Sequence, residues 1–207
     1  MAGGIGTTKT LRLRDGAVLN YNPVRTLAKT AGYFTAGDRG FLSESTQLDA
    51  ASGTYTLPTA GLVHLSKLHL PNPATITNLV TYVTTAGATL TASQCFAALY
   101  TAGGVKVGIT GNQATLWATA GLQTMPLAVP YVATAGDYYI ALWFNGTTGP
   151  TLGTTGNNTI AAFVNAGFAT AASVAATADA SITTAASAVA TLGTKTAIAK
   201  RLWVAVS

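Results

Sequence analysis

The stretch Gly136-Asp-Tyr-Tyr-Ile-Ala-Leu-Trp-Phe-Asn-Gly146 decides the fold of this chain. Residues 138–144 form an unbroken apolar run, and turn-forming residues stand on either side of it. Aromatic and β-branched side chains favour a pleated, half-buried surface, whereas glycine, asparagine and aspartate favour turns. Because this run is apolar on both faces, we expect a central strand that is buried on both sides.

The tripeptide Thr-Ala-Gly recurs through the chain and separates short runs rich in valine, leucine, tyrosine and phenylalanine. Its glycine allows the positive φ of a tight turn, so we interpret the repeat as turn punctuation. The spacing of the runs is typical of a sandwich or a barrel. We therefore predict an all-β fold, an antiparallel jelly-roll-like β-sandwich preceded by an extended N-terminal arm. The seven copies begin at Thr30, Thr35, Thr59, Thr85, Thr101, Thr119 and Thr134.

The individual strands follow from the positions of these runs. Pro126 and Pro130 are expected near strand ends, where a missing amide donor does least harm. Residues 169–192 consist mainly of alanine, threonine and serine, without a clear helical period, and favour a pair of irregular strands or a long loop. The predicted strands are 62–70, 76–83, 94–100, 105–109, 123–129, 137–145, 159–165 and 197–206.

Charged residues are scarce in this chain. They make up 8% of its 207 residues, against about 25% in typical soluble domains, while 49% of the residues are hydrophobic. Threonine, serine, asparagine, glycine and alanine fill the resulting surface. A neutral surface of this kind suits contact with copies of the same chain or with carbohydrate better than contact with a charged ligand. Together with the need to cover sheet edges, it favours a homotrimer.

The net charge of +5 is concentrated near the ends of the chain. Residues 1–40 contain six basic residues and two aspartates, whereas residues 71–191 contain only Lys106, Asp137 and Asp179 as charged groups. The basic surface that nucleic acid requires is therefore missing from the central part, and we expect no nucleic-acid partner. We predict two parts, an extended basic anchoring arm at 1–50 and a β-sandwich domain at 51–207. The candidate partner-binding residues of the arm are Lys9, Arg12, Arg14 and Arg25.

The chain has few residues that could bind a metal ion or act in redox or nucleophilic chemistry. Cys95 is the only cysteine, and its setting indicates a buried strand position. His64 and His69 are five apart on one predicted strand, so they point to opposite faces and cannot share a metal ion. We expect both to be partly exposed. We predict no metal site and no cofactor.

Few residues of this chain could act as a catalytic acid or base. Glu44 is the only glutamate, and Asp137 and Asp179 are isolated in neutral surroundings. A glycosidase needs two carboxylates about 5 to 10 Å apart. We therefore predict that the protein is not an enzyme, with a polysaccharide depolymerase acting through Asp137 or Asp179 as the alternative.

Trp117 is the candidate for a glycan contact, since it lies in a polar stretch and a tryptophan ring can stack on a sugar face. The N-terminal residues lack the apolar segment of a signal peptide, and no window is long enough for a spanning helix. We therefore expect that the chain does not insert into a membrane and that it is assembled in a cytoplasm.

Three segments, residues 96–104, 116–127 and 136–146, are similar to β-sandwich domains of structural virion proteins in tailed phages of actinobacteria. The resemblance covers about residues 54–165 and consists of strand and turn patterns without functional side chains. It implies a virion surface protein of the minor tail or tail fibre type that is assembled in the host bacterial cytoplasm, joins other tail proteins and contacts host cell-wall glycan. The alternative is a capsid decoration protein, or head fibre, whose arm clamps the major capsid protein. The chain lacks the heptad stalk that precedes the tip of a fibre protein.

Overall fold

The computed structural model describes residues 10–12, 18–20, 34–47, 53–155 and 174–207, and the chain divides into two compact units, Met1–Arg39 and Gly40–Ser207. In the first unit, β1 (Thr10–Arg12) and β2 (Val18–Asn20) pair in antiparallel fashion. A short 3-10 helix, η1 (Ala36–Arg39), ends the unit. The N–H and Oγ1 of Thr35 both donate to the carboxylate of Asp38. These two hydrogen bonds stabilise the start of η1.

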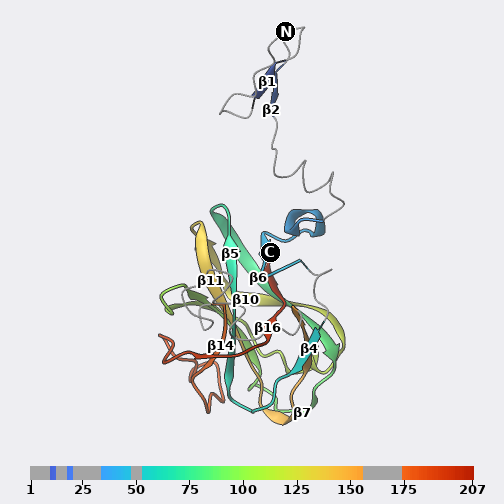
Figure 1. Cartoon of the computed structure of the whole chain (residues 1–207). Coiled ribbons are helices and arrows are strands. Elements are labelled where there is room, and N and C mark those ends of the chain that lie inside the picture. Colours follow the sequence, from blue (N-terminus) through green and yellow to red (C-terminus); the bar gives the residue numbers. More distant parts are fainter. Residues whose placement is uncertain (1–9, 13–17, 21–33, 48–52, 156–173) are drawn as a thin grey trace. The chain divides into compact units, whose positions relative to one another are not determined.

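The second unit is built from two large antiparallel sheets (Figure 1). In the six-stranded sheet the order is β15-β14-β5-β11-β8-β9, and in the seven-stranded sheet it is β16-β13-β6-β17-β3, with β10 beside β6 and β4 beside β13. Strands β7 and β12 form a separate pair. The predicted all-β antiparallel sandwich is confirmed. The elements are β3 (Ser43–Glu44), β4 (Gly53–Thr56), β5 (Val63–Leu70), β6 (Ala74–Thr85), β7 (Ala88–Leu90), β8 (Phe96–Thr101), β9 (Lys106–Ile109), α2 (Ala114–Trp117), β10 (Gly121–Ala133), β11 (Gly136–Trp143), β12 (Gly146–Thr148), β13 (Thr151–Thr155), β14 (Ala175–Ala178), β15 (Thr196–Ala197), β16 (Arg201–Leu202) and β17 (Val204–Val206).

Strand β11 is central in its sheet, as its sequence predicts, and it pairs with β5 on one side and β8 on the other. Because side chains alternate along a strand, its apolar run is divided between two clusters. Tyr138, Ile140 and Leu142 enter the inner core, the apolar cluster between the two sheets. That core also contains Leu68, Ile76, Leu79, Leu99, Trp117, Met125, Leu152 and Val204.

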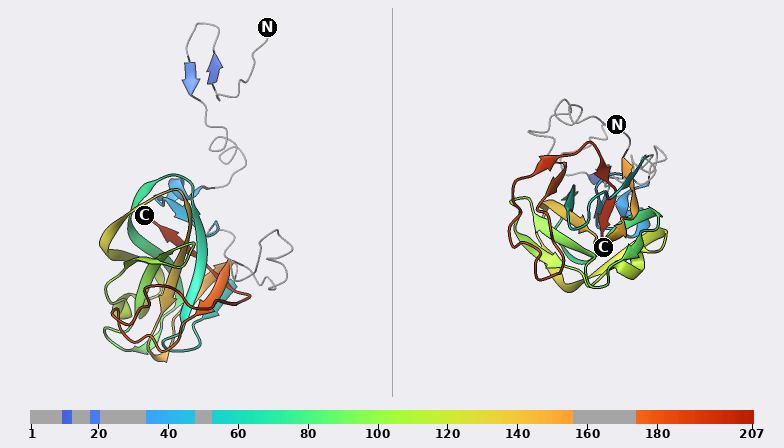
Figure 2. Two further views of the ribbon diagram at one scale, coloured as in Figure 1. Left: turned by 90° about the vertical axis from the view of Figure 1, so that its left-hand side faces the viewer. Right: turned by 90° about the horizontal axis from the view of Figure 1, so that it is seen from below.

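The opposite face of β11 is covered by an outer layer formed by residues 179–192 (Figure 2). Tyr139 and Trp143 lie on this face. Strand β14 precedes this layer and extends the six-stranded sheet beside β5. The layer itself is irregular apart from a single bridge between Thr191 and Val105. The prediction of irregular structure is confirmed for these residues, while 169–173 lie outside the described part. The layer contributes the buried side chains of Ile182, Ala188 and Leu192 to this cluster, and β14 adds Ala176 and Ala178 from the sheet itself.

The boundary between the two units lies earlier than the predicted boundary at residue 50. Strand β3 pairs with β17, so residues 43 and 44 belong to the seven-stranded sheet. Phe41 packs edge-on against Trp203, with ring centroids 5.8 Å apart. The indole Nε1 of Trp203 donates to Thr46 O and Glu44 Oε2. Residues 41–46 are thus part of the sandwich.

The Thr-Ala-Gly copies at Thr59, Thr85, Thr101, Thr119 and Thr134 lie between strands or at strand ends, as predicted. Gly61 shows why the glycine is needed. Its φ is +73°, and a Cβ there would lie 3.1 Å from the backbone of Ser181 and Ile182. At this copy the turn therefore also packs against a distant segment of the chain.

Six of the eight predicted strands match a single observed strand, with the largest difference at β10. This strand is longer than predicted and contains Pro126 and Pro130 in its interior, since it lies at an edge of the sheet where proline is tolerated. The predicted strand 197–206 is divided into short pieces, and 159–165 lies outside the described residues. Strands β3, β4, β7, β12, β13 and β14 were not predicted.

Candidate interaction surfaces

Trp117 does not form the exposed glycan platform that its sequence context suggested, so this prediction is wrong. The indole is fully buried, with 0% of its surface exposed, and it belongs to the inner core. The short helix α2 turns the side chain into the end of the sandwich, and the backbone oxygen of Trp117 accepts the amide of Gly87. A ring in this position cannot stack on a saccharide.

The other predicted site residues belong to the first unit. Arg12 lies in β1, and its strand partner is Val18. Lys9, Arg14 and Arg25 lie outside the described residues. Their assignment as partner-binding residues stays a prediction.

The two histidines of β5 differ in their surroundings. They point to opposite faces, as predicted, and His69 is exposed. His64 is fully buried beside Tyr55, so the expectation of partial exposure is wrong for this residue. Its Nδ1 donates to Leu62 O, while its Nε2 has no protein partner. Burial lowers the pKa of His64 to about 4, with the Leu62 hydrogen bond acting in the opposite direction.

A charged cluster lies at one end of β5 and β11. Asp137 contacts Lys67 Nζ through one oxygen at 2.6 Å and His69 Nδ1 through the other at 2.8 Å. The hydrogen bond from Lys67 is the main reason that the pKa of Asp137 is lowered. A general acid needs the opposite shift, because it must keep its proton near neutral pH. We interpret the cluster as a surface ion-pair network.

Asp179, the other predicted acid, and Cys95 both lie in surroundings that give them a role in the fold. Asp179 accepts a hydrogen bond from the amide of Gly193. Cys95 is buried, as predicted, and burial raises the pKa of its thiol. Within the described residues, no group of three or more histidine, cysteine or acidic side chains is placed to hold a metal ion.

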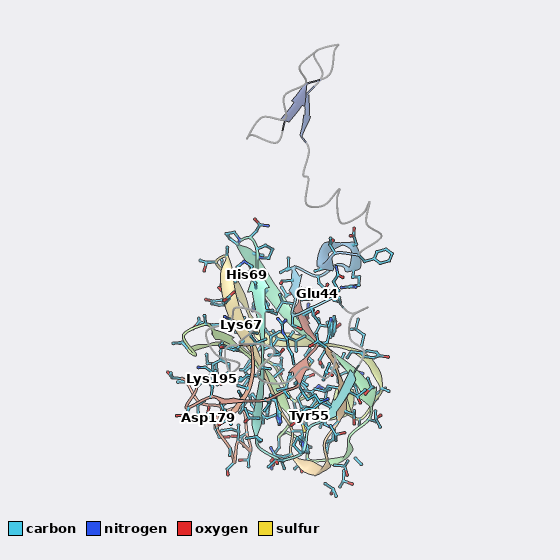
Figure 3. All side chains as sticks on the ribbon, viewed as in Figure 1. Glu44, Tyr55, Lys67, His69, Asp179 and Lys195 are labelled. Carbon is cyan, nitrogen blue, oxygen red and sulfur yellow. The ribbon has the colours of Figure 1, made fainter. Side chains whose placement is uncertain are left out.

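The charges of the sandwich are unevenly distributed. Figure 3 shows Lys67, His69, Lys195 and Asp179 along one side of it, with Glu44 on the other side in that view. Strands β6 and β10 carry no charged residue over their whole length. The surface formed by these strands can therefore interact only through neutral polar groups and apolar contact.

A groove of about 430 Å³ runs between β9 and β10. Leu127 approaches Gly108 closely, and it also forms a bridge with Thr110. Beyond that point β10 has four residues opposite one residue of β6, so the chain bulges away from the sheet. The groove lies beside this bulge. It is lined by Lys106, Val107, Gly108, Ile109, Ala128, Val129, Pro130 and Tyr131.

Sequence reasoning missed both the charged cluster and the groove. The spacing of Lys67 and His69 indicates that they share a face, but their pairing with Asp137 depends on the register between β5 and β11. For the groove, Pro126 and Pro130 within the apolar run 125–133 were an available signal of an edge strand with a bulge.

In comparisons with known proteins, no protein-family model and no curated protein matches this chain. Among the described residues, no helix has the length and the hydrophobicity that a membrane crossing requires.

Proposed function

We propose that the protein is a non-enzymatic surface component of a tailed bacteriophage virion, of the minor tail or tail fibre type. The observation that carries the proposal is the sequence resemblance of residues 96–104, 116–127 and 136–146 to structural virion proteins. The observed fold is the one that this resemblance implies. Function in such a protein resides in surfaces, where weak contacts become strong through the many copies on a particle.

The neutral surface of the sandwich supports a partner without strong charge. In the tail-type assignment, this partner is host cell-wall glycan. The burial of Trp117 removes the glycan contact that the sequence suggested, so another exposed surface would have to bind the sugar. The lowered pKa of Asp137 supports a binding role over acid catalysis.

Capsid decoration is the second candidate, and the division of the chain into two units favours it. The first unit holds six basic residues against two aspartates, which suits an acidic capsid surface. In this arrangement the arm clamps neighbouring capsid subunits and the sandwich projects from the head. Such binding would weaken as salt screens the charges.

The position of the protein on the virion tests the proposal. Purified particles of the phage that encodes it are examined by cryo-electron microscopy after labelling with antibody against the sandwich. Label at the tail would support the tail assignment, and label over the head would support decoration. Particles that lack the protein would contradict both.

The contribution of the arm is tested with a deletion of residues 2–39. The deletion must end at Arg39, because Phe41 and β3 belong to the sandwich. For a decoration protein, we expect the shortened chain to lose salt-sensitive binding to undecorated heads. Neutral substitution of Lys9, Arg12 and Arg14 should weaken binding in the same way. A deletion that binds as well as the full chain would contradict the clamping role.

The proposed homotrimer is tested by light scattering at micromolar concentration. The expected mass is three times the 20.9 kDa of one chain. A mass of one chain would contradict self-assembly.

A further inference from the structure

We infer that the outward face of the seven-stranded sheet around Tyr82 is a binding platform for a neutral saccharide. The inference rests on the proposed tail-type function, in which the partner is host cell-wall glycan, and it names a surface that can replace the buried Trp117. It is carried by the position of the Tyr82 ring, the hydroxyl groups around it, the lack of charge and the pairing of the strands. The platform consists of Thr54, Tyr82, Thr84, Leu122, Thr124 and Gly153.

The ring of Tyr82 rests on the neighbouring strand β13. A Cβ added at Gly153 would come within 3.2 Å of Tyr82 Cδ1 and 3.8 Å of Tyr82 Cβ, so a side chain at position 153 would press against the ring. Tyr82 nevertheless stays 37% exposed, and its partner on the opposite strand, Leu122, is 49% exposed. An exposed aromatic ring that is held in a fixed place can stack on the apolar face of a sugar.

Threonine hydroxyl groups surround the ring on the same face of the sheet. Thr54 is exposed and is the strand partner of Gly153. Thr84 lies two positions from Tyr82 on β6, and Thr124 is exposed on the neighbouring strand β10. Residues that are two apart on a strand, or opposite each other on paired strands, share a face. Because neighbouring strands are about 5 Å apart, these hydroxyl groups lie within reach of a short oligosaccharide.

The hydroxyl groups favour a sugar over an apolar protein surface. Thr84 Oγ1 donates to Thr151 O at 3.1 Å, and its oxygen can still accept a hydrogen bond. An apolar surface laid on the platform would bury the threonine hydroxyl groups without new partners, which is unfavourable. A sugar brings hydroxyl groups that can donate to them and accept from them, while its CH groups meet the ring of Tyr82.

The pairing of β6 rules out the addition of an extended peptide at the platform. Residues 79–83 of this strand pair with β10 on one side, and β17 and β13 pair with it on the other side. Backbone groups that are already paired cannot accept a further strand. The platform can therefore be contacted only through its outward side chains.

The platform offers no partner to a charged ligand. Strands β4, β6, β10 and β13 contain no charged residue. Two other strands of this sheet carry charges that are engaged elsewhere, since Glu44 accepts from Trp203 Nε1 and Arg201 donates to Lys67 O. A polymer with phosphate or carboxylate groups would lose water at the platform without gaining an ion pair. A saccharide that binds there is therefore a neutral one.

The inference is tested by binding of the full-length chain to immobilised polysaccharides. The probes are the neutral polysaccharide fraction of host cell walls and, beside it, a galactan, a mannan and a glucan. We expect saturable binding to at least one of them that added salt does not weaken, because no charge takes part. Tyr82→Ala should weaken the apparent affinity by about tenfold, as expected for a central aromatic contact. Tyr82→Phe keeps the ring and should retain most of the affinity.

Further variants separate the position of the ring from general damage to the sheet. Gly153→Ala removes no group, but its methyl must displace the ring of Tyr82, so it should weaken binding less than Tyr82→Ala does. If Tyr82→Ala fails to fold, Leu122→Ala removes an exposed side chain beside the ring and should also weaken binding. Val132→Ala is the matched control, because it truncates an exposed side chain near the other end of β10. It should bind as the wild type does.

A wild-type chain that binds none of the neutral probes would overturn the inference, as would a folded Tyr82→Ala variant that binds as tightly as the wild type. Binding only to anionic cell-wall polymers, weakened by salt, would overturn it too. These outcomes are distinct from a failure of the proposed function. Label at the tail without polysaccharide binding would reject the platform and keep the tail assignment. Particles that lack the protein would reject the virion assignment, and a polysaccharide result with the purified chain would still stand.

Discussion

The two faces of β11 are buried in different ways. On the inner face, large side chains from both sheets meet, such as Leu142 from one sheet and Leu79 from the other. On the outer face, the sheet contributes the large rings of Phe96, Tyr139 and Trp143, while its cover is an irregular segment rich in alanine. One strand is thus buried by a packed core on one side and by a thin layer on the other.

The thin outer layer is fastened by individual polar contacts in addition to apolar packing. Lys106 Nζ donates to Ala188 O, the Tyr100 hydroxyl donates to Val189 O, and the Gly193 amide donates to Asp179. Burial raises the pKa of Tyr100 to about 12, and the charge of Asp179 adds to the shift. Small side chains bury little apolar area each, so these bonds matter more here than in the inner core. The comparison shows that a segment without regular secondary structure can still bury one face of a central strand.

The largest effect should come from the inner core. We expect Leu79→Ala to lower the free energy of unfolding by about 4 kcal/mol, because it removes a fully buried side chain between two sheets that cannot close the cavity. Urea unfolding at neutral pH measures the change. A loss under about 1 kcal/mol would show that the inner core rearranges freely.

The second prediction concerns the pH dependence of stability that the buried His64 causes. Its folded-state pKa of about 4 lies below the usual 6.5, so the unfolded chain binds a proton more readily. Stability from this group is full above about pH 6.5 and is lost as pH falls toward 4. The loss amounts to about 3 kcal/mol. We expect unfolding of the wild type to show this loss and His64→Leu to lack that part of it.

Leu65→Ala is the control for this prediction, because it truncates a buried side chain that does not titrate on the same strand. It should lower the stability but leave its pH dependence between 6.5 and 4 close to that of the wild type. If His64→Leu and the wild type lose the same stability over this range, the burial of His64 has no thermodynamic consequence.

The third prediction concerns a leucine-to-alanine substitution in the outer layer. Leu192→Ala should cost about 2 kcal/mol, less than Leu79→Ala, because the layer is thin and can settle onto the smaller residue. Hydrogen exchange should show earlier opening of residues 179–192 than of β11 in this variant. Equal losses for the two leucine variants, with uniform exchange, would mean that both faces of β11 unfold as one unit.

The smallest effect is expected from the surface cluster. Asp137→Asn removes the ion pairs to Lys67 and His69 and should cost less than about 1 kcal/mol, since the carboxylate is partly exposed and its charge is screened. Its lowered pKa places the contribution above the usual pKa of an aspartate, and the contribution is lost as pH falls through the lower folded value. The comparison of wild type and variant in low and high salt measures it. A cost as large as that of Leu79→Ala would show that the cluster is a structural centre.

Local patterns predicted most of the long strands, because alternation and turn residues act over a few positions. The apolar run of β11 and the turns at Thr-Ala-Gly are examples. Short strands such as β13 escaped prediction, since Thr-Leu-Gly-Thr-Thr has little strand signal and its pairing with β4 and β6 is non-local. The prediction that Trp117 is exposed was wrong for a related reason. Its polar neighbours indicated exposure, but the direction of α2 places the ring in the core.

By itself, the sequence determined the all-β class, the central position of β11 and the uneven distribution of charge, because composition and alternation act locally. The tertiary structure decided the division of the run in β11 between two clusters, the burial of His64 and the meeting of Asp137 with Lys67 and His69. It also decided where the β9–β10 groove opens. These features depend on which distant strands pair and in which register, and a single residue of register shift would move a side chain to the opposite face.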